Sequence, residues 1–262
     1  MRFRMYWRGS ITAMLLALWA LIGAAMAQTT VPTTVPTTQP WQSATEPALK
    51  SSGEMKMHEQ FLELGKKGDI DLLFVGDSIT DFWRRPDRGL AVWNEYFAPL
   101  KAANFGISGD RTQHVLWRIQ NGELDGFQAK VIVLLLGTNN LSSPPKSIRN
   151  TNEETIAGLK LVVAGIRRHQ PGAKLLILGI FPRGKEADNP YRQDIKVVNG
   201  ELAKMDDGKS IFYLDIGDHF LLPDGSLNTD LFIDGNLHPN AAGYEVWAKA
   251  IIGKVKGLLA TP

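Results

Sequence analysis

The feature that most constrains the fold is an alternation of short apolar runs with longer stretches of helical period. The apolar runs cover residues 70–75, 103–105, 131–136, 175–180 and 211–214. Helical periodicity occupies residues 54–66, 112–122, 152–169, 192–204 and 241–259. Continuous apolar strands that alternate with helices are typical of a parallel sheet covered on both faces. The sequence therefore predicts one three-layer α/β/α domain over residues 54–262, built on a five-stranded parallel sheet.

The N-terminal region predicts export. Residues 1–27 begin with three arginines and no acidic residue, continue as a nearly uninterrupted apolar run, and end in Ala25-Met26-Ala27. This pattern indicates a secretory signal peptide cut after Ala27, and an uncleaved membrane anchor is the alternative. Residues 28–53 begin with three Thr-Thr-x-Pro repeats, which favour an extended, flexible linker. We therefore expect a bacterial periplasmic or secreted protein.

Composition excludes several function classes. Beyond residue 27 the chain has 26 basic and 27 acidic residues, so it offers no electrostatic footprint for nucleic acid. The chain contains no cysteine, which excludes disulfides, thiol nucleophiles and thiolate metal ligands. We expect no contact with a membrane beyond the N-terminal segment.

Candidate site residues follow three of the predicted strands. Ser78 follows the first in Gly76-Asp77-Ser78, Gly109 follows the second, and Asn139 follows the third. Ligands of open parallel sheets bind outside the carboxyl ends of the strands. Each residue also has an ordinary structural interpretation, because Asp and Ser cap helices and Gly and Asn occupy turns.

A loop near the C-terminus contains Asp234 and, four residues later, His238. This Gly- and Pro-containing loop is of the kind that carries function. The other four histidines lack such a setting, and we interpret them as structural: His58, His114, His169 and His219.

Together these residues supply what acyl transfer needs. A serine hydroxyl becomes a nucleophile when a histidine accepts its proton, and a carboxylate orients that histidine. Fixed N–H donors stabilise the negative charge that develops on the carbonyl oxygen. Neither a metal nor another cofactor is required.

The order of the motifs resembles that of the SGNH (GDSL-type) hydrolases, and most of all the esterases like the catalytic subunits of platelet-activating-factor acetylhydrolase. The resemblance extends over residues 61–258 and includes the motifs at 74–78, 104–110, 114–118, 121–124, 137–140 and 179–184 and the block around His238. It implies a flavodoxin-like fold and, because similar proteins dimerise, a homodimer.

The resemblance also implies a role for each site residue. Ser78 is the nucleophile and His238 the general base and then acid. The backbone N–H groups of Ser78 and Gly109 and the side-chain amide of Asn139 form the oxyanion hole. The family usually places its aspartate three residues before the histidine, whereas here position 235 is glycine and Asp234 lies four before. Either Asp234 still reaches the imidazole, the extra residue being absorbed at Gly235-Asn236, or a backbone carbonyl orients His238.

We therefore expect an exported serine esterase that hydrolyses O-acyl esters, above all O-acetyl esters of carbohydrates, without a cofactor. Two alternatives remain open at this point. One is lipolytic or thioesterase activity at the same site, and the other is a non-catalytic glycan-binding module on a decayed hydrolase scaffold.

Overall fold

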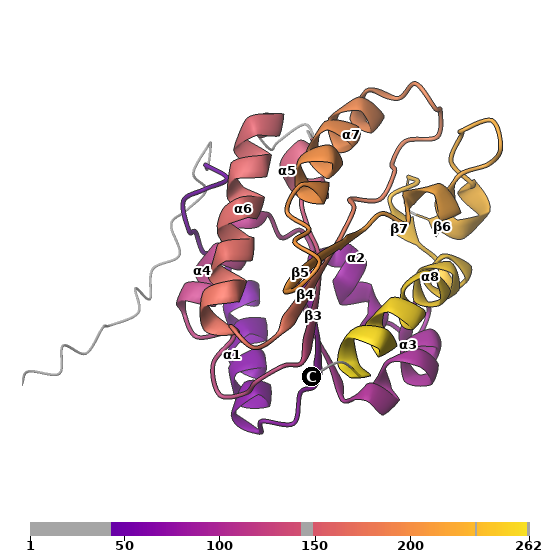
Figure 1. Cartoon of the computed structure of the whole chain (residues 1–262). Coiled ribbons are helices and arrows are strands. Elements are labelled where there is room, and N and C mark those ends of the chain that lie inside the picture. Colours follow the sequence, from indigo (N-terminus) through magenta and orange to yellow (C-terminus); the bar gives the residue numbers. More distant parts are fainter. Residues whose placement is uncertain (1–42, 143–148, 234, 261–262) are drawn as a thin grey trace, which may run out of the picture. The chain divides into compact units, whose positions relative to one another are not determined.

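A computed structural model describes residues 43–142, 149–233 and 235–260 of the chain. Its centre is a five-stranded parallel sheet with the strand order β2-β1-β3-β4-β5 (Figure 1). The strands are β1 (Leu72–Gly76), β2 (Ala102–Gly106), β3 (Val131–Leu135), β4 (Lys174–Leu178) and β5 (Ile211–Leu214). The bounds of each strand differ by at most two residues from those of a predicted apolar run. The predicted parallel α/β sheet is therefore confirmed. The order is that of flavodoxin-like sheets, whose topological switch point lies between β1 and β3.

Helices cover both faces of the sheet, and Figure 1 shows them as two outer layers. One face packs against α1 (Ser52–Lys66), α4 (Thr112–Gln120), α6 (Asn152–His169) and α7 (Pro190–Ala203). The other packs against α3 (Leu90–Tyr96) and α8 (Ala241–Ala260). Alternate residues of a strand point to opposite faces, so Leu73 and Val75 enter the first core while Leu72 and Phe74 enter the second.

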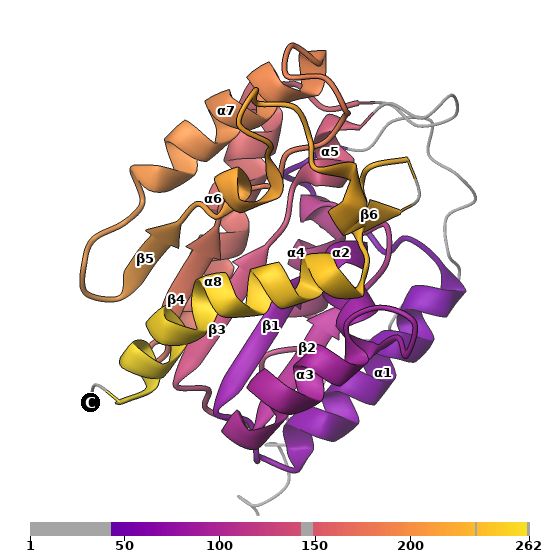
Figure 2. The same ribbon diagram turned by 90° about the vertical axis from the view of Figure 1, so that its right-hand side faces the viewer.

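Several short elements have no counterpart in the sequence prediction, because they are too short to show a periodicity. They are α2 (Ser78–Asp81), α3, α5 (Thr138–Leu141), four 3-10 turns, and the two-stranded antiparallel ladder of β6 (Phe232–Ile233) and β7 (His238–Pro239). In Figure 2 β6 and α2 lie at the same end of the molecule, beyond the carboxyl end of β1.

Residues 43–51, which the sequence analysis assigned to the linker, lie against the folded domain. Ala44 is fully buried, and its carbonyl accepts a hydrogen bond from Thr112 Oγ1 at 2.7 Å. The backbone N–H of Ala48 donates to the carbonyl of Gln113 at 3.0 Å. These contacts bring the chain alongside the start of α4 before α1 begins.

The N-terminal segments lie largely outside the described residues. The predicted signal peptide (1–27) and linker residues 28–42 are not described. Within the part of the chain that the structure does describe, no helix is both long and apolar enough to cross a membrane.

Candidate active site

Ser78 and His238 lie in direct contact although 160 residues separate them in sequence. Ser78 is the first residue of α2, directly after β1, and His238 is the first residue of β7. Ser78 Oγ lies 2.9 Å from His238 Nε2, and the His238 ring packs on Phe82 with a centroid distance of 4.8 Å. A serine hydroxyl at this distance from an imidazole nitrogen is positioned for proton transfer.

Asp77 caps α2, the helix that begins with Ser78. Its carboxylate caps α2 by accepting a hydrogen bond from the backbone N–H of Ile79 at 3.0 Å. The side chain is almost completely buried. Burial raises the pKa of Asp77 to about 7, and the hydrogen bond from Ile79 opposes the shift. Asp77 therefore binds a proton more tightly in the folded chain than in the unfolded one.

This shift predicts how Asp77 affects stability. Because the pKa rises from 3.8 to about 7 on folding, the contribution of Asp77 to stability falls as the pH rises through that window. Asp77→Asn retains a good helix cap and removes the buried charge. We expect its free energy of unfolding to exceed that of the wild type by roughly 2–4 kcal/mol at pH values above about 7.

Urea denaturation at a series of pH values measures this difference, which should disappear near the acidic end of the range. Asp188→Asn, which removes an exposed carboxyl, is the control, and a difference independent of pH would contradict the assignment.

The turn before His238 contains two residues in the left-handed region. Gly235 has φ +70° and Asn236 has φ +64°, between strands paired at Ile233 and His238. Glycine adopts this conformation without strain, and asparagine tolerates it better than most residues. These are the two positions at which an extra residue was expected to be absorbed, and they lie in the turn between the antiparallel strands β6 and β7. Asp234 itself lies outside the described residues.

A second loop, at the end of β2, is attached to α2. The backbone N–H of Ser108 donates to Asp81 Oδ2 at 3.2 Å, and the Ser108 hydroxyl donates to the same oxygen. Asp81 also pairs with Arg84, whose guanidinium donates to the carbonyl of Gly106 at 2.7 Å. Gly109 follows with φ +80°, a conformation that strongly favours glycine. The loop that carries Gly109 is therefore fixed to the helix that carries Ser78.

Asn139 is connected to the same loop. It lies in α5, after β3, and its side-chain amide donates to the carbonyl of Asp110 at 2.9 Å. An amide has two N–H donors, so this bond orients the group and uses one of them. The neighbouring Asn140 is fully buried, and its side-chain oxygen accepts from the backbone N–H of Thr112 at 3.1 Å. Of the predicted residues, Gly109 thus directly precedes Asp110 in the chain and Asn139 donates a hydrogen bond to the Asp110 carbonyl.

Beneath this loop lies a cluster of buried charges that the sequence analysis did not single out. The fully buried Asp110 carboxylate accepts from Arg118 Nη2 at 2.8 Å and from Lys50 Nζ at 2.9 Å. Arg118 also pairs with Glu123 in the interior. One signal was present in the sequence, because Arg118 follows the apolar residues Val115 and Leu116 on the buried side of α4. A charge at such a position needs a buried partner.

The cluster includes three groups of metal-ligand type. Atoms of Glu54, Asp110 and His114 lie within 4.8 Å of one another. Burial lowers the pKa of His114 to about 3, so its imidazole is neutral, and its Nδ1 accepts from the backbone N–H of Arg111 at 3.0 Å. Asp110, however, already binds the Lys50 ammonium and the Arg118 guanidinium. Two adjacent cations repel a metal ion, so we assign no metal to this cluster.

The remaining described histidines have other settings. His58 is buried, with Nε2 3.1 Å from the carbonyl of Asn121, and packs edge-on against Trp117. His169 Nδ1 lies 3.2 Å from a carboxylate oxygen of the exposed Asp125, and His219 is exposed on a 3-10 turn.

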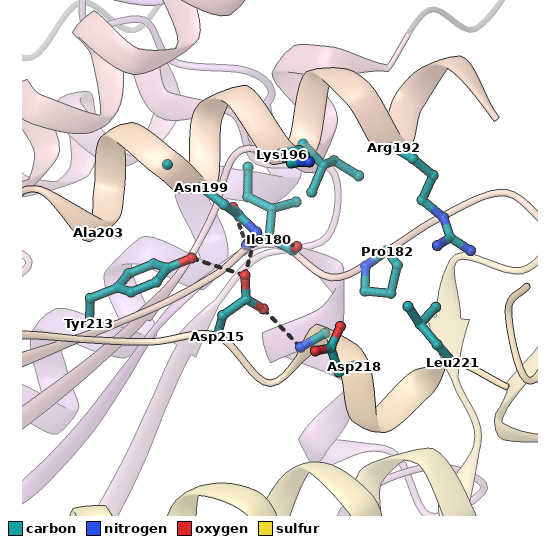
Figure 3. A pocket seen from close by; sticks show the side chains of 13 residues that line it. Ile180, Pro182, Arg192, Lys196, Asn199, Ala203, Tyr213, Asp215, Asp218 and Leu221 are labelled. Atoms are coloured by element: carbon teal, nitrogen blue, oxygen red, sulfur yellow. Dashed lines mark hydrogen bonds between the residues drawn. The ribbon is translucent and has the colours of Figure 1, made fainter. Parts of the chain in front are cut away.

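A separate cavity of about 440 Å³ lies beyond the carboxyl ends of β4 and β5 (Figure 3). Asp215 is one of the polar residues that line it. Its carboxylate accepts from Tyr213 Oη and Asn199 Nδ2 at 3.1 Å each and from the N–H of Gly217 at 2.8 Å. Tyr213 lies in β5 and Asn199 in α7, so Asp215 connects these two elements. The lining includes none of the predicted site residues.

A serine–histidine pair at the end of β1, next to the switch point, places this chain among α/β proteins with the site geometry of a serine hydrolase. The model of the GDSL-like Lipase/Acylhydrolase family matches residues 74–246. The chain therefore belongs to this family, and it is an ester-bond hydrolase.

Individual relatives agree with this assignment. Platelet-activating factor acetylhydrolase IB subunit alpha2 of Rattus norvegicus is 39% identical over 207 residues, which cover 78% of this chain and 84% of that protein. A GDSL-like lipase from Bacteroides thetaiotaomicron has a similar structure, with a TM-score of 0.60, 17% identity, and coverage of 78% of this chain and 97% of that one. An acetylxylan esterase from Geobacillus stearothermophilus gives a TM-score of 0.54 at 17% identity, with coverage of 73% and 94%.

Proposed function

We propose that this protein is a serine esterase that removes acetyl groups from O-acetylated carbohydrates. The observation that carries the proposal is the 2.9 Å contact between Ser78 Oγ and His238 Nε2. It joins the predicted nucleophile to the predicted base at the end of the sheet where ligands of such folds bind.

In the proposed reaction Ser78 Oγ attacks the ester carbonyl carbon while His238 Nε2 takes the hydroxyl proton. His238 then gives this proton to the alcohol oxygen as the C–O bond breaks, which leaves an acyl-serine. A water molecule, deprotonated by His238, then attacks the acyl carbon. The bond from this carbon to Ser78 Oγ breaks, His238 returns the proton to Oγ, and the carboxylic acid is released. The N–H groups of Ser78 and Gly109 and the amide of Asn139 stabilise the oxyanion in both steps. Asp234 orients the imidazole through Nδ1.

The acyl group and the alcohol are inferred from the relatives and the N-terminus. The relative from Rattus norvegicus is named an acetylhydrolase, and the Geobacillus stearothermophilus neighbour is titled an acetylxylan esterase. Both names favour acetyl as the acyl group. We propose that residues 1–27 direct export, which places the enzyme where polymeric carbohydrates are found. Lipolytic or thioesterase activity is the second candidate, since the family description includes lipases.

Labelling of the purified chain with a fluorophosphonate probe, followed by peptide mapping, tests the site. We expect one adduct, on Ser78, because only an activated serine displaces the fluoride. A folded protein without an adduct on Ser78 would contradict the mechanism. Turnover of p-nitrophenyl acetate, butyrate and octanoate, together with acetate release from acetylated xylan, tests the substrate. Preference for octanoate and no release from xylan would favour the lipolytic alternative.

A further inference from the structure

Lys50 reaches the loop of Gly109 from the segment that precedes α1. Its ammonium donates to the carbonyl oxygen of Ser108 at 2.7 Å and to Asp110 Oδ1 at 2.9 Å. It therefore binds on both sides of Gly109. Its side chain is 27% exposed, whereas that of Asp110 is fully buried.

The bond to Ser108 acts on the peptide group that contains the Gly109 N–H. The carbonyl of Ser108 and the N–H of Gly109 belong to one peptide plane, and in a trans peptide they point in opposite directions. An ammonium that holds this carbonyl on one side therefore directs the Gly109 N–H to the other side. It also polarises the amide, which strengthens that N–H as a donor.

The local turn explains why such a restraint is needed. The N–H of Asp110 donates to the carbonyl of Ile107 at 3.1 Å, and Gly109 at the third position has φ +80°. These are the features of a type II turn. Types I and II differ mainly in the orientation of the central peptide, and glycine at the third position tolerates either. A flip of this peptide would turn the Gly109 N–H away.

The backbone at Lys50 is itself held in place by hydrogen bonds. Its backbone N–H donates to the carboxylate of Glu54, which is buried in the first turns of α1. The Ala48 N–H is bonded to Gln113, and Asp110 is anchored from below by Arg118. The ammonium is thus presented to the turn from a fixed backbone and against a fixed carboxylate.

We propose that Lys50 is a positioning residue for the oxyanion hole, which holds the Ser108–Gly109 peptide so that the Gly109 N–H points towards the acyl oxygen. This inference rests on the proposed function. It assigns to the segment before α1 a part in catalysis without contact with the substrate.

The test compares Lys50→Met with Lys50→Arg and with Lys56→Met in the full chain. Lys56 is exposed on α1, so Lys56→Met makes the same change of charge away from the turn. For Lys50→Met we expect kcat on p-nitrophenyl acetate and the rate constant of fluorophosphonate labelling to fall by about 10- to 100-fold. KM and the melting temperature should change little. Lys50→Arg, whose guanidinium also offers several donors, should recover part of the loss, and Lys56→Met should match the wild type.

Two outcomes would overturn the inference. One is a Lys50→Met enzyme with the kcat of the wild type. The other is a loss that appears in KM or in the melting temperature and that Lys50→Arg does not reduce, because this would indicate a purely structural role. The proposed function is tested separately in the same assays, since a wild type without turnover or without an adduct on Ser78 would refute the mechanism itself.

Discussion

Replacement of Ser78 by alanine is expected to lower the turnover of p-nitrophenyl acetate by up to about a million-fold, if the catalytic residues act as one unit. The hydroxyl removed is the group that lies 2.9 Å from His238 Nε2. The cap of α2 comes from Asp77, not from Ser78, so the backbone of the site should survive the change. Thermal unfolding should therefore show a melting temperature close to that of the wild type.

Ser52→Ala is a suitable control because Ser52 is exposed in the first turn of α1 and lies outside the site. It should retain full turnover and label with fluorophosphonate like the wild type. If Ser78→Ala kept more than a few per cent of the activity, the nucleophile would have to be a residue other than Ser78.

Asp234→Asn is expected to lower kcat by about ten-thousand-fold if the carboxylate orients His238, as in the best-studied analogous triad. The geometry sets this expectation. Nε2 of His238 faces Ser78, so a triad carboxylate must reach Nδ1. An asparagine amide would favour the wrong tautomer of the imidazole.

The pH dependence of kcat and the rate of fluorophosphonate labelling would both report this loss. Asp230→Asn, an exposed carboxyl a few residues upstream, should leave both unchanged. A decrease in kcat of less than about ten-fold for Asp234→Asn would mean that a backbone carbonyl orients His238. This is the alternative suggested by the spacing of four residues, not three, between Asp234 and His238.

The sheet could be predicted from the sequence because its signal is local. Each strand is a continuous apolar run between polar segments, and burial on both faces makes such runs uniform. Ser78, Gly109 and Asn139 could be named as candidates because each lies within a few residues of the end of a strand, and the resemblance implied their roles. His238 was found from its loop and from the resemblance of the motifs.

The rest could not be predicted because it depends on partners distant in sequence. Lys50 meets Ser108 and Asp110 across 58 and 60 residues, and no periodicity encodes such a pair. β6 and β7 have two residues each, too few for an alternation to be visible. The predicted linker contained no signal that Ala44 is buried, because the small side chain of alanine is common at every depth.

The large sequence separation of Ser78 and His238 has a consequence for folding. The helix that carries Ser78 directly follows β1, but His238, 160 residues later in the chain, reaches it only when the β6–β7 hairpin packs against α2. Contacts of such long range form late, because loop closure must come first. If Ser78 and His238 act as proposed, a chain whose hairpin has not yet packed should have no esterase activity. Recovery of turnover during refolding would mark the docking of the C-terminal hairpin, not the formation of the sheet.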